Sequence, residues 1–230
     1  MNFRRPGLQG KWLHVVNSLE RIIPAYERGS SRISLFIDGT MRDETVGFAV
    51  RGGELVLDLG SGPGTMAILV ERRGGIPVLL DVSMRMLSAS THEHRVRAAF
   101  ENLPFREASF AAVVSGFALR DSRDLVRALV EVRRILALRG KLGFCDLGKP
   151  TDPFWKVMIG LYIRIFAPLI GMLSAGLAGL RFGSLFQTYV LTLDNEELAR
   201  LLHSFFGEVN LHARQFGGSI VVKCSRGGQL

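Results

Sequence analysis

The chain has 230 residues, 47% of them hydrophobic, which is enough for one domain with a large core. The two cysteines, Cys145 and Cys224, lie too far apart for a CxxC metal pair and form no disulfide framework, so we expect a reducing compartment. A net charge of +8 favours an anionic partner, but the basic residues are scattered through the chain, as on an ordinary solvated surface. No nucleic-acid motif accompanies them, which disfavours nucleic acid as the partner.

The N-terminus carries no signal peptide, because charged and polar residues interrupt the stretch behind Arg4 and Arg5. The first clear motif is an apolar run, residues 54–59, that ends in a glycine-rich turn over residues 60–64 and continues as a helical pattern from Met66. A second apolar run then ends at Asp81, about twenty residues after the first glycine. We therefore expect two parallel strands joined by a crossover helix.

The alternation of strands and helices continues through the chain. Further strands are predicted over residues 96–100, 110–115 and 141–146. Between the last two we expect a helix with Asp121 or Ser122 as its N-cap and Gly140 just past its end. A last helix over 194–205, with Asp194 and Glu197 as a capping pair, precedes strands over 209–212 and 219–223. The short link between these strands makes them antiparallel. The expected fold class is an α/β doubly wound sheet, mostly parallel, with an antiparallel last strand.

Residues 153–183 interrupt this pattern. Between Val157 and Leu180 the only charged residue is Arg164, while Pro168 and several glycines break the stretch. A membrane span would fit the length, but the flanking elements must return to the same sheet. We therefore favour two apolar helices that lie over the carboxyl edge of the sheet.

Two carboxylates frame the candidate cofactor site. Asp58 precedes the turn by two residues and Asp81 ends the second strand, where it could accept hydrogen bonds from both ribose hydroxyls. The GxGxG spacing differs from the GxGxxG of dinucleotide sites, and a carboxylate beside the turn suits the ammonium group of a methionine moiety better than a pyrophosphate. The alternative is a purely structural turn in another α/β protein.

With these motifs, the chain resembles the family of demethylmenaquinone and ubiquinone-precursor C-methyltransferases, class I enzymes with a Rossmann-like fold that use S-adenosylmethionine. The likeness covers most of the chain in the same order. It rests on Val56–Thr65, Asp81 with Ser83-Met84, Glu101–Phe105, Phe117–Asp121, Glu131 with Arg134–Leu136, Gly140–Leu142, Lys149-Pro150 and Gly217-Gly218.

The resemblance implies S-adenosylmethionine as cofactor, S-adenosylhomocysteine as product and no metal. Relatives usually carry Asn or Asp at the position of Ala99, so the backbone would serve the adenine there. For Met86 and Phe100, core packing is the alternative. The implied cofactor residues are Asp58, then Gly60, Ser61, Gly62, Pro63 and Gly64 around the methionine end, Asp81 on the ribose, Val82, Met86, Ala99 and Phe100 at the adenine, and Ser115 and Gly116 on the methionine side.

Arg120 is the implied substrate residue, because methylation of a ring carbon needs the quinol oxygen held as an anion. Its alternative role is a salt bridge with Asp121 or Asp124 at the start of a helix. Tyr26, Asp38 and His14 are each candidates for proton removal, and Asp121 stands where the family has Asn.

The expected organisation is one methyltransferase domain over residues 1–230, with N-terminal helices over 1–50 that cover the cofactor and an apolar helical insertion over 151–190 that caps the substrate. The expected function is C-methylation of a lipophilic, prenylated quinol precursor by a cytoplasmic enzyme in peripheral contact with the inner face of a membrane. The alternatives are a methyltransferase for another lipid-like acceptor or RNA, and a non-catalytic cofactor-binding protein at a membrane surface. Both a monomer and a homodimer remain open.

Overall fold

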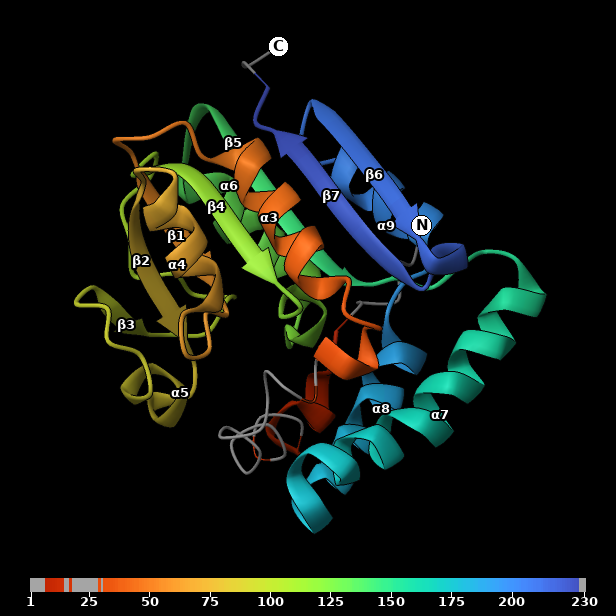
Figure 1. Cartoon of the computed structure of the whole chain (residues 1–230). Coiled ribbons are helices and arrows are strands. Elements are labelled where there is room, and N and C mark those ends of the chain that lie inside the picture. Colours follow the sequence, from red (N-terminus) through yellow and green to blue (C-terminus); the bar gives the residue numbers. More distant parts are fainter. Residues whose placement is uncertain (1–6, 15–16, 18–28, 30, 228–230) are drawn as a thin grey trace.

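A seven-stranded sheet forms the centre of the computed structural model, which describes residues 7–14, 17, 29 and 31–227 (Figure 1). The strands are β1 (Leu55–Leu59), β2 (Ile76–Asp81), β3 (Arg95–Arg97), β4 (Phe110–Gly116), β5 (Leu136–Leu147), β6 (Glu208–Arg214) and β7 (Ser219–Ser225). They lie in the order β3-β2-β1-β4-β5-β7-β6, with β1 to β5 parallel. Since β7 runs antiparallel to both β5 and β6, the predicted fold class is confirmed.

Helices cover both faces of the sheet (Figure 1). Helices α3 (Asp38–Ala49) and α4 (Thr65–Arg72) pack on one face, and α6 (Leu125–Ile135) and α9 (Asn195–His203) on the other. Each helix buries an apolar stripe, because apolar residues three and four apart share one side of a helix. In α6 this stripe is Leu125, Ala128, Leu129, Val132 and Ile135.

The C-terminal helix begins as predicted. The Asp194 side chain accepts a hydrogen bond from the Glu197 amide at 2.9 Å, and the Glu197 carboxylate accepts one from the Asp194 amide at 3.0 Å. This reciprocal capping box confirms the predicted start of α9.

The helix predicted from Asp121 to Gly140 is wrong at both ends. Its N-cap is Asp124, whose side chain accepts a hydrogen bond from the Arg127 amide at 3.1 Å. The helix ends at Ile135, and Gly140 lies inside β5, where Leu136 already pairs with Phe110 of β4. Pairing with a neighbouring strand therefore outweighs the helical propensity of the intervening residues.

The third strand is shorter than predicted. It ends at Arg97, whereas the prediction continued to Phe100. Ala99 lies in a turn, where its carbonyl accepts a hydrogen bond from the Asn102 amide at 3.2 Å. The turn carries Ala99 and Phe100 away from the sheet edge.

The apolar insertion contains one long helix in place of two interrupted ones. Helix α7 (Pro153–Ala175) is 23 residues long and continues through Pro168. The 3-10 segment η3 (Gly176–Gly183) then folds back along α7 and leads into α8 (Ser184–Leu191). Gly171 and Gly179 permit this close approach, because a Cβ on either would meet the carbonyl of the other.

Helix α7 lies beyond the carboxyl ends of the strands, and its outer side is exposed (Figure 1). Residues Pro153–Ser174 are long and apolar enough to cross a membrane by length and composition, and 22% of this stretch is buried. The remaining short elements are η1 (Gln9–Lys11), α5 (Met84–Ser88), η2 (Leu119–Asp121) and η4 (Gln215–Gly217).

Candidate active site

The candidate site lies where the strand order reverses, between β1 and β4. At this point the crossover connections leave the sheet in opposite directions, which opens a crevice at the carboxyl ends of the strands. Three strands end at this crevice: β1 with Asp58 and Leu59, β2 with Asp81, and β4 with Ser115 and Gly116.

The glycine-rich turn after β1 forms one wall of the crevice. Gly60 has a φ of +74°, and a Cβ at this position would meet the side chain of Ala118 and come within 2.9 Å of Phe100 Cζ. Gly64, with a φ of +100°, is the N-cap of α4. Only glycine combines this backbone conformation with the close approach of these side chains to the turn.

Asp81 is held in a fixed orientation by two backbone amides. Its Oδ2 accepts a hydrogen bond from the Gly62 amide at 2.9 Å, and its Oδ1 accepts one from the Ser83 amide at 2.8 Å. The carboxylate therefore ties the end of β2 to the glycine-rich turn. A carboxylate oriented in this way at the pocket edge suits a ligand with two adjacent hydroxyl groups, because it accepts hydrogen bonds through both oxygens.

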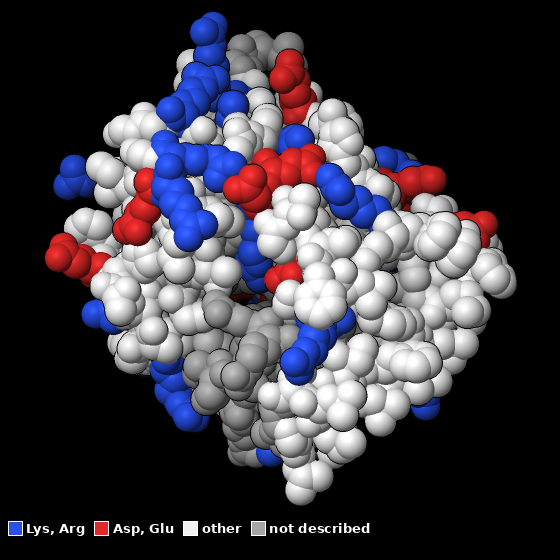
Figure 2. Space-filling model, in the orientation of Figure 1, with Lys and Arg blue, Asp and Glu red and all other residues white. Residues whose placement is uncertain are grey.

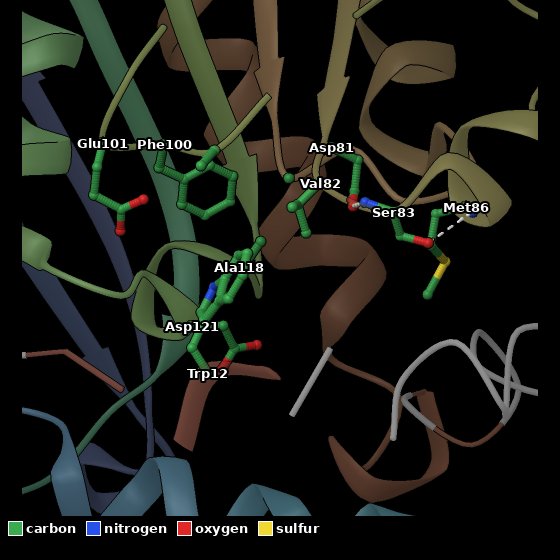
Figure 3. A pocket seen from close by; sticks show the side chains of 11 residues that line it. Trp12, Asp81, Val82, Ser83, Met86, Phe100, Glu101, Ala118 and Asp121 are labelled. Atoms are coloured by element: carbon green, nitrogen blue, oxygen red, sulfur yellow. Dashed lines mark hydrogen bonds between the residues drawn. The ribbon is translucent and has the colours of Figure 1, made fainter. Parts of the chain in front are cut away.

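The structure brings six of the predicted cofactor residues together around one pocket (Figure 3). They are Gly60, Asp81, Val82, Met86, Ala99 and Phe100. Figure 3 shows the Phe100 ring and Val82 on either side of the pocket, with Asp81 at the end of its strand and Trp12 and Asp121 along another border. Five further lining residues were missed by the sequence interpretation: Trp12, Ser83, Glu101, Ala118 and Asp121.

Asp58 is fully buried beneath the turn. Its Oδ2 accepts a hydrogen bond from the Ala67 amide at 3.1 Å, while Oδ1 has no hydrogen-bond partner among the described residues. Burial raises the pKa of Asp58 to about 7, against the opposing effects of the Arg42 charge and the Ala67 hydrogen bond. Asp58, Ser61, Gly62, Pro63 and Gly64 are not among the residues that line the pocket, and their predicted contacts with the cofactor stay predictions.

Ser115 and Gly116 occupy the end of β4. The Ser115 hydroxyl is buried and donates a hydrogen bond to the Leu59 carbonyl at 2.7 Å, so this side chain joins β4 to β1. Gly116 is buried directly beside Arg42 of α3. Neither residue lines the pocket around Asp81, and their predicted contact with the methionine end stays a prediction.

A second, larger cavity lies beside the first pocket. It measures about 340 Å³, within the usual range of small-molecule sites. Its walls come mainly from α7, η3 and α8 of the insertion and from residues near Ile33. Most of the lining is apolar, including Leu147, Trp155, Ile159, Tyr162, Phe182 and Leu185, while Ser34, Arg120, Gln215 and Ser219 supply polar groups.

Arg120 lines this apolar cavity and is held by two acids. Its Nη1 contacts Asp146 Oδ1 and donates to the Phe117 carbonyl at 2.7 Å, while Nη2 lies 3.5 Å from Asp121 Oδ2. The predicted ion pair with Asp121 is present, whereas Asp124 caps α6. Asp146 was missed by the sequence interpretation, although its place at the end of β5 is a signal for a site residue.

Asp121 lies between the two cavities. It contacts Arg120 on one side and lines the pocket around Asp81 on the other. Burial raises its pKa to about 6, with the Arg120 charge opposing the shift and Asp146 adding to it.

Replacing Asp121 by Asn is expected to stabilise the protein at alkaline pH. The pKa of Asp121 in the folded state lies above the ordinary value of 3.8, so the charged carboxylate destabilises the folded state. This destabilisation is complete above about pH 6 and disappears progressively as the pH falls toward 4. Asp121→Asn should therefore raise the free energy of unfolding by about 1–3 kcal/mol at pH 8 and by much less at pH 4. Urea denaturation at both pH values measures this. Glu107→Gln, at an exposed carboxylate, serves as control, and a gain independent of pH would contradict the assignment.

Of the other candidates for proton removal, Tyr26 falls outside the described residues, and His14 and Asp38 line neither the pocket around Asp81 nor the apolar cavity. His14 is exposed, and Asp38 begins α3, where it accepts a hydrogen bond from the Ser34 hydroxyl at 3.1 Å. Within the described ranges no group of three metal-ligating side chains occurs, and Cys145 and Cys224 are buried free thiols.

Comparison with known families identifies the central part of the chain. The family pattern described as "Methyltransferase domain" matches residues 57–144, from β1 to β5. A solved structure of a "SAM-dependent methyltransferase, possible histamine N-methyltransferase" from Thermotoga maritima has a TM-score of 0.66 over 93% of this chain and 100% of its own, at 19% identity. A SAM-dependent methyltransferase from Aquifex aeolicus has a TM-score of 0.52 over 85% and 92%, at 15% identity. These likenesses concern the fold.

The similarity to curated relatives covers a larger part of the chain. A demethylmenaquinone methyltransferase from Listeria welshimeri is 33% identical over 169 residues, which cover 68% of this chain and 72% of the relative. The enzyme of the same name from Thermotoga maritima is 31% identical over 175 residues, or 71% of this chain and 75% of the relative.

Proposed function

Since this chain belongs to the demethylmenaquinone methyltransferase family and is an S-adenosylmethionine-dependent methyltransferase, we propose that it methylates a ring carbon of a prenylated quinol precursor. The observation that carries the proposal is the apolar cavity of about 340 Å³ with the Arg120 guanidinium in its wall, directly beside the cofactor crevice. An apolar cavity with one fixed cation suits a greasy molecule that bears an ionisable oxygen.

The crevice fits the cofactor that the family implies. The nearest atom to a Cβ on Gly62 would be Met86 Sδ at 3.9 Å, so the glycine-rich turn leaves room for a ligand close to its backbone. The oriented carboxylate of Asp81 suits a ribose diol, and Phe100 and Val82 offer flat and apolar surfaces for a purine. When bound, S-adenosylmethionine supplies the methyl group, and S-adenosylhomocysteine is the product.

The protein's own contribution to the reaction is orientation and charge. Arg120 would hold the quinol oxygen as an anion, which raises the electron density of the neighbouring ring carbon. Asp146 and Asp121 fix the Arg120 side chain, so this cation does not have to be ordered when the substrate binds. The ring proton that the methyl group replaces must then leave the ring carbon, which restores the aromatic ring.

The N-terminal region and the apolar insertion would enclose the reactants. We assign residues 1–50 to the cofactor side, supported by Trp12, which lines the pocket around Asp81. We assign residues 151–190 to a cap over the substrate, supported by the residues of α7, η3 and α8 that line the apolar cavity.

Incubation of the purified protein with S-adenosylmethionine and demethylated quinols of different prenyl lengths tests the proposal. Mass spectrometry should detect a product heavier by one methylene unit, with S-adenosylhomocysteine formed in equal amount. Nuclear magnetic resonance of the product distinguishes a methyl group on carbon from one on oxygen. S-adenosylhomocysteine binding without turnover of any quinol would refute the proposed acceptor while leaving the enzyme class intact.

We further propose that α7 and η3 dock on the cytoplasmic surface of a membrane that stores the quinol. The region over α7 and α8 is largely uncharged in the view of Figure 2. Large apolar side chains lie exposed along it, among them Val157, Leu161, Ile165, Leu169, Leu173 and Leu177. Lys149, Lys156 and Arg164 line a groove beside this face and suit anionic headgroups.

Replacing Leu173 and Leu177 together by Ser is expected to weaken membrane binding about tenfold or more, because both side chains would insert into the lipid interface. They are 79% and 80% exposed, so the fold should tolerate the change. Flotation with vesicles that contain phosphatidylglycerol measures binding. Leu138→Ser, at a 62% exposed leucine of β5, is the matched control. Equal flotation of both variants and the wild type would exclude this face as the docking surface.

A further inference from the structure

Arg42 of α3 is a buried arginine that forms no ion pair with an acid in the described part of the chain. Its side chain is 7% exposed, yet its guanidinium forms no hydrogen bond or ion pair with any residue in the described part of the chain. The contact that it does make is with the Phe117 ring, whose centroid lies 5.0 Å from Cζ. Nε is fully enclosed without an acceptor.

A buried arginine in this state is costly to the fold. The guanidinium remains protonated at every physiological pH, so burial cannot be relieved by loss of the proton. Buried charges are normally paired, because desolvation without a partner is destabilising. Arg120, which is similarly buried, illustrates the usual arrangement with Asp146 and Asp121 at its tip. The unmatched charge of Arg42 therefore points to a ligand that completes it.

Arg42 lies beside the carboxyl ends of β1 and β4, behind the residues that line the two described cavities. A Cβ on Gly116, at the end of β4, would meet Arg42 Nη1 and would lie 3.0 Å from Met66 Cγ. Met66 belongs to the first turn of α4, directly after the glycine-rich turn. The Arg42 charge also lowers the pKa of Asp58 at the end of β1. Arg42 thus lies close to the carboxyl ends of β1 and β4 and to the first turn of α4.

The chemistry of the cofactor selects one group for this position. S-adenosylmethionine and S-adenosylhomocysteine contain a single anionic group, the carboxylate of the methionine or homocysteine part. The pocket around Asp81, Val82 and Phe100 is suited to the nucleoside, which leaves the amino-acid part for the β1–β4 side. We propose that Arg42 binds this carboxylate through the paired nitrogens of its guanidinium. The inference rests on the proposed use of S-adenosylmethionine.

A quinol oxygen is the other anion that the reaction offers, and the structure favours Arg120 for it. Arg120 lines the apolar cavity, whereas Arg42 is absent from that lining. Two separate cations would then serve two separate anions. The assignment of Arg42 predicts an effect on the cofactor alone, without a change in the affinity for the acceptor.

Calorimetric titration with two ligands tests the assignment. S-adenosylhomocysteine contains the carboxylate, and 5′-methylthioadenosine is the same nucleoside without the amino-acid part. Arg42→Gln should lower the affinity for S-adenosylhomocysteine by about 10- to 150-fold, as expected for the loss of a charge-assisted hydrogen-bonded pair. The affinity for 5′-methylthioadenosine should stay within about twofold of the wild type, and Arg42→Lys should give an intermediate loss.

The two ligands distinguish a failure of the Arg42 assignment from a failure of the cofactor assignment. Arg73→Gln is the matched control, since Arg73 also contacts α3 but pairs with Asp43 at the surface. Equal losses for both ligands, or no loss for S-adenosylhomocysteine, would overturn the role of Arg42. If Arg42→Gln does not fold, the same ratio measured for Arg42→Lys decides. A wild-type protein that binds neither ligand would instead refute the cofactor itself.

Discussion

Replacing Arg120 by Gln is expected to lower kcat/KM for the quinol at least about 100-fold, while S-adenosylhomocysteine still binds. The reason is that Arg120 presents the only described cation in the lining of the apolar cavity, and loss of one preorganised charge at a developing anion costs about 10²- to 10³-fold in rate. The measurement is steady-state kinetics at saturating cofactor, together with calorimetry of the same preparation.

A loss of activity in Arg120→Gln must be distinguished from a loss of the folded state. Removing Arg120 leaves Asp146 and Asp121 without their cation, which destabilises the fold by about 3–5 kcal/mol. Assays should therefore be run well below the melting temperature of the variant. Asp146→Asn weakens the support of Arg120 while keeping the guanidinium, so it should lower kcat less than Arg120→Gln does. Unchanged kcat/KM in folded Arg120→Gln would mean that the residue serves only as a salt bridge.

Replacing Asp81 by Ala is expected to reduce S-adenosylhomocysteine affinity by at least about 100-fold. The variant loses the acceptor for two ribose hydroxyls, each hydrogen bond to a charged group contributing about 1.5–3 kcal/mol. It also frees the Gly62 and Ser83 amides that shape the turn. Calorimetric titration measures the loss, with dinucleotides as competitors.

The Asp81 variants also discriminate between cofactor classes. Asp81→Asn keeps an acceptor oxygen in the same place, so it should retain more affinity than Asp81→Ala. A wild-type preference for a dinucleotide over S-adenosylhomocysteine would contradict the cofactor assignment. Retention of full affinity in Asp81→Ala would show that the ribose lies elsewhere in the crevice.

The sheet and half of the cofactor pocket could be predicted because their signals are local. Short apolar runs that end in glycine or aspartate indicate strands whose carboxyl ends meet at one edge. The Asp194–Glu197 capping box is equally local, since both hydrogen bonds form within one helical turn. For the same reason, Asp81 and Gly60 were placed correctly relative to each other.

The errors arose where distant parts of the chain decide the structure. Residues 136–140 favour a helix by composition, but they pair with β4. Asp146 and Arg120 are far apart in sequence and meet only after β5 joins the sheet. Trp12 and Arg42 come from the N-terminal region, and neither lies in a motif that indicates a site. Their roles depend on packing that no local pattern encodes.

The strand order also affects how the protein emerges from the ribosome. β5 is complete at Leu147, but its neighbour in the sheet, β7, begins only at Ser219. At a translation rate of about 5–20 residues per second, the edge of β5 waits several seconds for its partner. During that time an apolar strand edge and the apolar α7 are both available for wrong pairing. Nascent chains of this protein should therefore depend on chaperones until β7 inserts between β5 and β6.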